Sequence, residues 1–352
     1  MKNSYKLLLG IAIIFAIIGY VFGCKGVTNF KTKTKTIVIK DNETDRKTIE
    51  KLLAKDSITN GGTIFNTVAG VTNFWDKVKP GRYEIKHGAS AYEIIKALKN
   101  GLQKPVKLTI IKVRTPGELA KLVGKNFSID SGSFHKNFLN TTSLKSFGVD
   151  SATFLSSIIP NTFEIYFDAN GKTILKKIFD DSKAFWTAER KDKAQKLGFN
   201  THQIITLASI VEEESTNNDE KGNIASVYIN RVRKNMKLQA DPTVKFAMKN
   251  FAARQITYDM LKYPSPYNTY YTKGLMPGPI CTPSTKTIDA VLDSPETPYL
   301  FFVANSDFSN KHIFTTNDKE HEIYANLWRK ALAQQQQIKR DKEAAKKLDT
   351  AK

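Results

Sequence analysis

Residues Ile204 to Ser215 read IITLASIVEEES, an apolar run that ends in three consecutive glutamates. Its apolar residues recur at intervals of three and four up to Val211, which is the spacing of one face of a helix. Glu214 lies three residues after Val211 and continues that face, whereas Glu212 and Glu213 point away from its centre. The sequence therefore predicts a helix that aims one of its three terminal carboxyl groups at the packed side.

A carboxyl group held against apolar surroundings has a raised pKa, because burial disfavours its charged form. Such a group can donate a proton near neutral pH, as the general acid of a glycosidase must. A solvated acidic helix end would have the same three glutamates. The run by itself leaves both interpretations open.

The composition indicates a folded, basic protein. The chain has 352 residues, of which 41% are hydrophobic, and this suffices for two compact units beyond any anchor. The formal net charge of +20 predicts anionic surroundings. Nucleic acid is not the expected partner, because the lysines are spread along the chain and no zinc spacing or helix-turn-helix pattern occurs. A cell wall or a membrane surface fits the charge better. The two cysteines, Cys24 and Cys281, are far apart, so we expect neither a disulfide framework nor a metal cluster.

The N-terminal stretch is the most apolar part of the chain. Residues Leu7 to Gly23 carry no charge, and with its flanks the stretch is about 20 residues long, enough to cross a bilayer core of ~30 Å. It predicts a single membrane anchor, and lysines on both sides of the stretch leave its orientation open. A cleaved signal peptide is an alternative, although the cleavage pattern is poor. A lipoprotein signal ending at Cys24 is another, and there Phe22 is a bulky misfit.

Composition and periodicity divide the chain into segments. A small α+β module with a capping box at Ser90 and Glu93 comes first, and a mostly helical unit begins near Ser151. The expected parts are residues 1–24 as cytoplasmic tip and anchor, 25–35 as linker, 36–105 as α+β module, 106–150 as connecting region, 151–332 as helical unit and 333–352 as a polar charged tail.

The helical unit is expected to combine helices with two irregular features. A loop-rich stretch, Tyr263 to Pro283, is long enough to build a site, and residues 299–303 and 312–315 predict a hairpin. The expected helices are Ile174 to Gln195, Thr201 to Glu214, Asn223 to Lys234 and Thr287 to Leu292.

Four blocks make the chain recognisable. They are LASIVEEES, IASVYINRVRKNMKLQADPTV (Ile224 to Val244), SPYNTYYTKGLMPGPICTPS (Ser265 to Ser284) and TPYLFFVAN (Thr297 to Asn305). In this order they resemble the endolytic murein transglycosylase (YceG-like) family. The resemblance implies an α+β fold with an N-terminal transmembrane helix, a LysM-like subdomain at 36–105 and a mostly helical, lysozyme-like catalytic domain at 151–332 with a β-hairpin. The resemblance places that domain outside the cytoplasmic (inner) membrane, in the periplasm or at the wall, and the N-terminus inside.

The resemblance also implies an activity. Members of the family are lyases that cleave the MurNAc–GlcNAc bond inside nascent peptidoglycan glycan strands and leave 1,6-anhydroMurNAc ends, which terminates or trims strand growth. The catalytic glutamate of the family falls on Glu214, the residue that the helical periodicity also selects. Glu212 matches a second glutamate, in a supporting or a direct role. One carboxyl group suffices because the sugar's own 6-hydroxyl attacks, so no metal or organic cofactor is expected.

The matching blocks supply the candidate substrate contacts. Asn268 is the best candidate for orienting an acetamido group, and Asp241 contacts substrate, forms a turn before Pro242, or faces Glu214 as a glycosidase partner. At least one of Tyr267 and Tyr270, two tyrosines of the same block as Asn268, is expected to be buried. The full set of expected substrate-binding residues is Ser215, Gln239, Asp241, Thr243, Tyr267, Asn268 and Tyr270.

Several points stay open at the level of sequence. His312 and His321 match family positions but are expected to be structural. Residues Ile159 to Thr162 depart from the aromatic-Pro-Asp-Thr block of many members, which leaves substrate contacts from that loop in doubt. A non-catalytic wall-binding scaffold and a hydrolytic muramidase are the alternative functions. Binding to the cell-wall synthesis machinery is implied by the resemblance alone.

Overall fold

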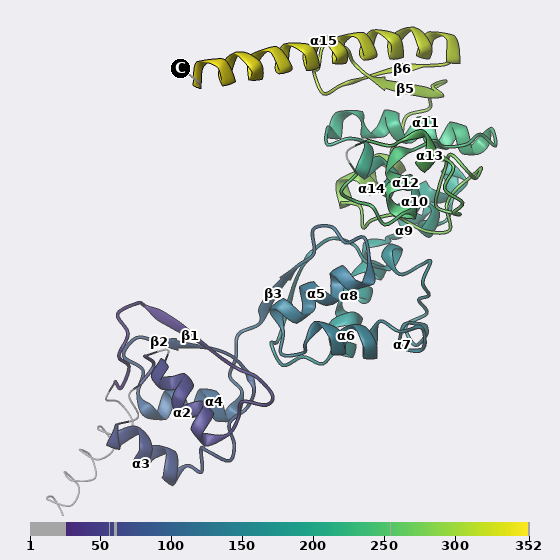
Figure 1. The fold of residues 1–352 in the computed structure, drawn as a ribbon. Helices are drawn as coiled ribbons and strands as arrows, with labels where there is room; N and C mark the ends of the chain where they lie inside the picture. Colours follow the sequence, from purple (N-terminus) through teal and green to yellow (C-terminus); the bar gives the residue numbers. More distant parts are fainter. Residues whose placement is uncertain (1–25, 56, 60–61, 254, 351–352) are drawn as a thin grey trace, which may run out of the picture. The chain divides into compact units, whose positions relative to one another are not determined.

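The computed structural model describes residues 26–55, 57–59, 62–253 and 255–350. They form a mixed α+β fold that is mostly helical, which confirms the predicted class (Figure 1). The predicted anchor at residues 1–24, including Cys24, lies outside the described residues. Among the residues that are described, no helix combines the length and the apolarity that a membrane crossing requires.

The chain forms two compact units whose segments alternate along the sequence. Of the described residues, the first unit takes those between 26 and 109 with 117–140 and 162–177, and the second takes 110–116, 141–161 and those between 178 and 350. Two short segments of the predicted connecting region, 110–116 and 141–150, thus belong to the same unit as the predicted catalytic helix.

The N-terminal part of the first unit combines two paired strands with three helices. The elements are β1 (Thr34–Ile39), α2 (Arg46–Lys55), α3 (Thr63–Val71), β2 (Gly81–Lys86) and α4 (Ala91–Asn100). Strand β1 runs antiparallel to β2 with Thr34 opposite Lys86. The alternating residues of β2 are buried and exposed in turn, as a half-buried strand requires. Helix α4 begins with the predicted capping box, in which the Ser90 hydroxyl and the Glu93 carboxylate bond each other's backbone.

The rest of the first unit is built around a second pair of strands. Its elements are β3 (Val106–Thr109), α5 (Pro116–Asn126), α6 (Ser131–Phe138), β4 (Thr162–Ile165) and the start of α8 (Gly171–Phe185). Strand β3 ends at Thr109 because its partner β4 is only four residues long.

The second unit is mainly helical. Its α-helices are α7 (Thr141–Lys145), α9 (Ala188–Leu197), α10 (Thr201–Glu214), α11 (Lys221–Arg233), α12 (Asp241–Ala247), α13 (Tyr258–Leu261), α14 (Thr285–Leu292) and α15 (Asp318–Thr350), with short 3₁₀ turns at Leu155–Ser157 and Asn218–Glu220. The predicted single helix from Ile174 to Gln195 is wrong. It is two helices, α8 and α9, because the Thr187 side chain caps a new helix start by accepting from the Arg190 amide.

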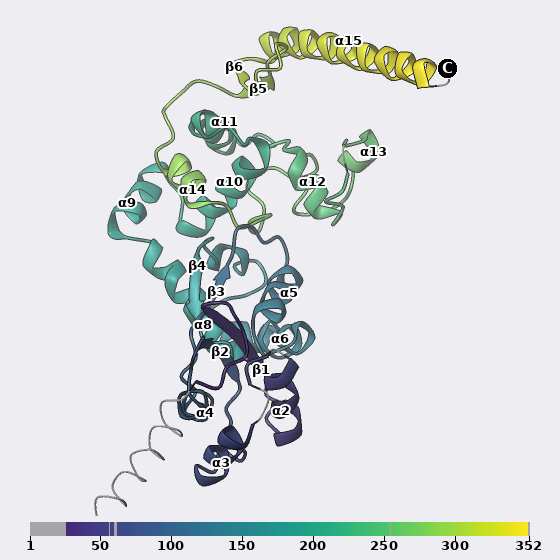
Figure 2. The same cartoon turned by 90° about the vertical axis from the view of Figure 1, so that its left-hand side faces the viewer.

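Helix α10 lies at the centre of this unit. Eight consecutive residues, Ile204 to Val211, are buried, and the Asn200 side chain caps the helix start. In Figure 2 the helix is surrounded by α11, α12 and α14, each of which contacts it. The core cluster joins apolar residues of these helices with parts of the loop at 275–280. The helix is thus held along its length and can present its last turn in a fixed position.

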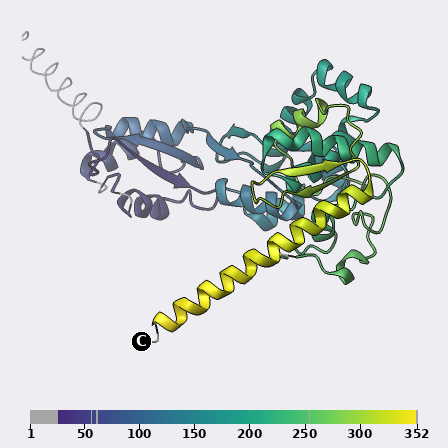
Figure 3. The ribbon, with the colours of Figure 1, turned by 90° about the horizontal axis from the view of Figure 1, so that it is seen from above.

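The C-terminal part of the unit is a hairpin followed by a long helix. Strands β5 (Phe301–Ala304) and β6 (His312–Thr315) pair antiparallel, which confirms the predicted hairpin. Helix α15 begins beside these strands and its later turns extend away from them (Figure 3). Those later turns correspond to the predicted polar tail, and the residues described between 334 and 343 are exposed.

Candidate active site

The three glutamates that end α10 have three different environments. All three side chains are partly buried, but they have different neighbours. A helix turns by about 100° per residue, so consecutive side chains reach different neighbours. Glu212 and Glu213 are each paired with cations, whereas Glu214 lines a cavity.

Glu214 accepts a hydrogen bond from one hydroxyl. The Tyr228 Oη–H, on α11, donates to Glu214 Oε1 at 2.9 Å. Burial raises the pKa of Glu214 to about 7, and the bond from Tyr228 acts in the opposite direction. The charge of Asp241 also raises this pKa, and Lys245 lowers it. The expected rise in the pKa of Glu214 is therefore present in the structure.

Glu212 sits in a buried network of donors. Its carboxylate accepts from Lys221 Nζ at 3.2 Å, from Ser284 Oγ at 3.0 Å and from the Thr287 hydroxyl. Lys221 is 5% exposed and also donates to Thr287. Burial acts to raise the pKa of Glu212, but the donors outweigh it and the pKa is lowered. Glu212 is thus held as an anion that fastens α10 to α11 and α14.

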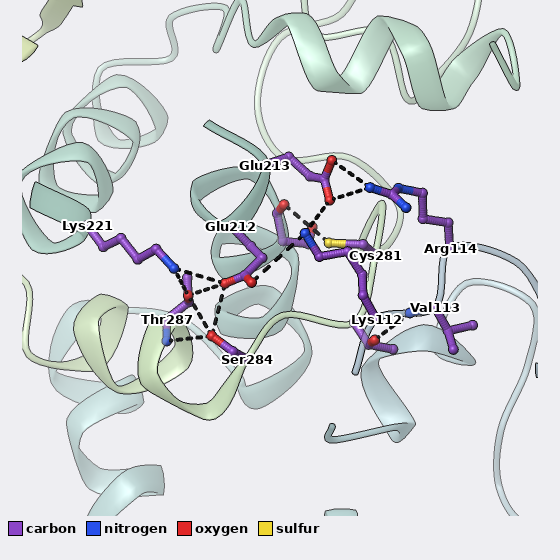
Figure 4. Close-up of polar contacts among 11 residues, drawn as sticks. Lys112, Val113, Arg114, Glu212, Glu213, Lys221, Cys281, Ser284 and Thr287 are labelled. Atoms are coloured by element: carbon purple, nitrogen blue, oxygen red, sulfur yellow. Dashed lines mark hydrogen bonds and ion pairs between the residues drawn. The ribbon is translucent and has the colours of Figure 1, made fainter. Parts of the chain in front are cut away.

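Glu213 is paired with two cations from the 110–116 segment. Lys112 Nζ lies 2.9 Å from Glu213 Oε1, and Arg114 Nη2 contacts both carboxylate oxygens at 3.0 and 3.1 Å. Burial acts to raise the pKa of Glu213, and these two cations lower it overall. Figure 4 shows Arg114 approaching Glu213 from one side while Lys221 approaches Glu212 from the other.

Glu214 opens into a cavity of about 420 Å³ within the second unit. Its walls come from the end of α10, from α11, from the segment that leads into α12, from the 263–283 loop, from β5 and from the first turn of α15. The lining residues are Glu214, Tyr228, Arg231, Leu238, Gln239, Asp241, Tyr270, Phe301, Phe302, Asp318, His321 and Glu322. A cavity of this size with a protonatable carboxyl group, aromatic rings and polar groups is suited to sugar residues.

A second carboxylate lines the same cavity. Asp241 is the first residue of α12 and is exposed, and its Oδ1 accepts from the Tyr270 hydroxyl at 2.7 Å. Gln239 precedes it with a left-handed backbone, φ 53°, and its side chain accepts from Arg231 Nη1 at 3.3 Å. Asp241 therefore begins α12 and lines the cavity, and its role toward the substrate stays a prediction.

Comparisons with known proteins show the family to which the chain belongs. A model of the YceG-like family matches residues 37–326. The chain belongs to the YceG-like family. It is 36% identical over 154 residues to a Bacillus subtilis protein named endolytic murein transglycosylase, which covers 44% of this chain and 42% of that protein. A Streptococcus pneumoniae protein of the same name is 26% identical over 305 residues, covering 77% of this chain and 54% of that protein.

The chain thus spans about half the length of the named relatives that it matches. A crystal structure of a yceG-like protein from Listeria monocytogenes is also similar. It covers 83% of this chain and 99% of its own, with 26% sequence identity and a TM-score of 0.57.

Two of the expected substrate contacts in this YceG-like chain are interior residues. Asn268 is 0% exposed, and its Nδ2 donates to the carbonyls of Leu261 and Tyr263 at 3.0 and 2.8 Å. Thr243 is also 0% exposed, and its hydroxyl donates to the Ala240 carbonyl. Neither side chain is exposed in this structure, and the polar groups of both are bonded inside the domain. They shape the loop and the start of α12.

Ser215 and Tyr267 also lie outside the cavity lining. Ser215 is buried and ends α10, where its Oγ accepts from the Asn217 amide at 3.0 Å. Tyr267 is half-buried and packs its ring against Phe246 with a centroid separation of 4.9 Å. Of the expected substrate-binding set, Gln239, Asp241 and Tyr270 line the cavity.

The sequence reasoning missed the residues that α11 and β5 contribute. Tyr228 and Arg231 lie inside the IASVYINRV block that carries the resemblance. Tyr228 could have been predicted to face the site, because its hydroxyl group needs a polar partner within a buried helix. Phe301 lies between Arg231, whose guanidinium carbon is 4.9 Å from the ring centroid, and His321, whose ring is 5.3 Å away. His321 therefore lines the cavity, whereas the ring of His312 pairs with Glu220 at 3.3 Å.

In the described part of the chain, no three His, Cys, Asp or Glu side chains gather in a metal-binding arrangement. The absence of a cofactor stays a prediction.

Proposed function

We propose that this protein is a membrane-anchored endolytic lytic transglycosylase that cleaves MurNAc–GlcNAc bonds in peptidoglycan and leaves 1,6-anhydroMurNAc ends. The observation that supports it most is Glu214, a carboxyl group with a pKa of about 7 that opens into a sugar-sized cavity. The names of the Bacillus subtilis and Streptococcus pneumoniae relatives support the same activity.

In the proposed reaction Glu214 acts twice. As an acid it donates its proton to the glycosidic oxygen while the bond from C1 of the muramoyl residue to that oxygen breaks. The 6-hydroxyl of the same residue then attacks C1, and the Glu214 carboxylate takes the hydroxyl proton. The C1–O6 bond forms, no water is consumed, and Glu214 returns to its acid form. A nucleophile within the substrate avoids the entropic cost of positioning a water molecule.

The surrounding residues prepare the carboxyl group for both steps. Because Tyr228 donates to Oε1, we assign the transferred proton to Oε2. Phe301 and Phe302 offer apolar faces on which sugar rings can pack, and Arg231 holds Phe301 in place while its Nε donates to the Leu300 carbonyl at 2.6 Å. Asp241 and Tyr270 line the cavity near Glu214 and are suited to accept and donate hydrogen bonds to sugar hydroxyls.

The proposed location follows from sequence. The uncharged stretch at Leu7 to Gly23 anchors the protein in the cytoplasmic membrane, with both units outside. The net charge of +20 favours binding to an anionic wall or to lipid headgroups. The α+β module at 36–105 serves as the LysM-like subdomain, and cell-wall synthesis proteins are the expected partners.

The decisive experiment reads the chemical structure of the products. The full chain, purified in detergent, is incubated with peptidoglycan beside Glu214→Gln, and the fragments are identified by mass spectrometry. We expect anhydromuramoyl ends, one water lighter than hydrolysed ends, and a loss of ~10²- to 10⁴-fold in the variant. Glu84→Gln, which removes an exposed carboxylate in the other unit, is the control and is expected to leave activity unchanged.

A hydrolytic muramidase is the second candidate, because Asp241 lines the same cavity as Glu214. In that case the products carry reducing ends, and Asp241→Asn abolishes their formation. Retained binding to peptidoglycan without any cleavage would contradict both enzymatic proposals and favour a scaffold.

A further inference from the structure

The 110–116 segment belongs to the second unit, although the residues on both sides of the segment belong to the first. The Val113 amide donates to the Thr282 hydroxyl at 2.9 Å, and the Thr282 amide donates to the Val113 carbonyl at 2.9 Å. The Ile110 amide donates to the Asn161 carbonyl at 2.9 Å. These three hydrogen bonds hold the segment so that its two cationic residues, Lys112 and Arg114, lie beside the end of α10.

The end of α10 is electrostatically unfavourable by itself. Three adjacent carboxyl groups repel one another when charged, and the C-terminus of a helix carries a partial negative charge that opposes further anions. Lys112 and Arg114 neutralise Glu213, and Lys112 also lies 4.0 Å from Glu212. The side chains of Lys112, Arg114 and Glu213 are only 29%, 31% and 19% exposed, so solvent weakens these pairs less than it weakens pairs on an open surface.

From this geometry we infer that Lys112 and Arg114 are positioning residues of the active site, which hold the last turn of α10 and thereby fix the Glu214 carboxyl group in the cavity. They act through Glu213, the neighbour of Glu214 in the chain (Figure 4). The inference rests on the proposed role of Glu214. It assigns a catalytic contribution to a region that the sequence presents as a connector about one hundred residues away.

The expected consequence is a loss of turnover rather than of binding. Neither cation lines the cavity, so removing both leaves the substrate contacts in place. A misplacement of the acid by about 1 Å can lower the rate by ~10²-fold. We therefore expect Lys112→Met/Arg114→Met to lower kcat by ~10²-fold and to change KM by less than about twofold.

The pH profile provides a second readout. The charge of Glu213 raises the pKa of Glu214, and this effect grows when the compensating cations are removed. Activity needs protonated Glu214, so the alkaline limit of activity should move to higher pH in the double variant. The other titratable or charged groups that face this cavity or act on Glu214 are Tyr228 and Arg231 on α11, Asp241 and Lys245 on α12, Tyr270 in the loop, and Asp318, His321 and Glu322 on α15. The double substitution leaves all of them in place.

The test uses the full chain with a matched control. Arg190 and Lys193 on α9 are cations of comparable exposure, 30% and 35%, and they pair with Asp289 and Asp293. Arg190→Met/Lys193→Met removes the same number of positive charges without touching the ion pairs of Glu212 and Glu213. Turnover of peptidoglycan, its pH profile and thermal stability are measured for both double variants. The charge-conserving swap Lys112→Arg/Arg114→Lys is expected to restore most of the lost kcat.

A second measurement does not depend on turnover. The carboxyl carbons of the glutamates are labelled with ¹³C, and the Glu214 signal is assigned from Glu214→Gln and titrated. An upward shift in Lys112→Met/Arg114→Met, together with the selective loss of kcat, supports the inference. It is overturned if both double variants lose kcat equally, or if the Glu214 titration is unchanged. If the double variant does not fold, Lys112→Met alone supplies the same comparison. If the wild type cleaves nothing, the proposed function fails, and the titration still shows whether the two cations act on Glu214.

Discussion

Replacing Tyr228 with phenylalanine tests how the Tyr228 hydroxyl affects the pKa of Glu214. The substitution removes only the hydroxyl that donates to Glu214 Oε1 at 2.9 Å and keeps the buried ring, which packs edge-on against Phe302 with a centroid separation of 5.8 Å. The bond lowers the pKa of Glu214, so its loss should raise that pKa further.

The size of the shift follows from the strength of the bond. A hydrogen bond to a charged group contributes about 1.5–3 kcal/mol, and one pKa unit corresponds to about 1.4 kcal/mol. The protonated carboxyl group still accepts part of this bond, so we take the lower end, a rise of about 1 unit. The pKa of Glu214 should move from about 7 to about 8. Since the acid form is the active one, the alkaline limb of the rate profile should move to higher pH by the same amount.

The assay measures the release of anhydromuramoyl products between about pH 5 and pH 9 by the wild type and by Tyr228→Phe. Tyr83→Phe is the matched control. Tyr83 is 0% exposed, and its hydroxyl donates to the carbonyls of Lys79 and Pro80 in the first unit. Because Tyr83 is in the other unit, its replacement should leave the alkaline limb of the rate profile at the same pH. A limb in Tyr228→Phe that stays in place or moves to lower pH would refute the assignment of Glu214 as the titrating acid stabilised by Tyr228.

Three further outcomes are expected. The pKa of Glu214 is raised from 4.5 to about 7, so its contribution to stability is full below about pH 4.5 and is lost as the pH rises through 7. Glu214→Gln should therefore be more stable than the wild type by up to about 3 kcal/mol at pH 8 in urea denaturation, with the difference closing at low pH. Asn268→Ala leaves the carbonyls of Leu261 and Tyr263 without their donor and should lower the free energy of unfolding by about 2 kcal/mol, whereas a change below a few tenths would contradict its structural role. Burial raises the pKa of the Cys281 thiol, so Cys281 should resist iodoacetamide until the protein unfolds, and rapid alkylation of Cys281 in the folded chain, located by peptide mass spectrometry, would show an open site.

The sequence predicted the parts of this protein that depend on local periodicity. It gave the bounds of α10 from Thr201 to Glu214 and the capping box of α4, and it selected Glu214 among three adjacent glutamates. Each of these depends on residues only a few positions apart. The helical repeat decides which of the three carboxyl groups continues the apolar face, and no distant residue is needed for that choice.

The tertiary structure decided the partners of those glutamates. Tyr228 is 14 residues from Glu214 on another helix, while Lys112 is 101 residues from Glu213 in a segment expected to be a connector. Asn268 carries a residue type suited to sugars, yet its polar atoms are used inside the loop. Local sequence sets the direction in which a side chain leaves its own helix. Which group meets it there depends on how distant segments pack together, and this fixes whether a carboxyl group is paired with a cation or kept protonated.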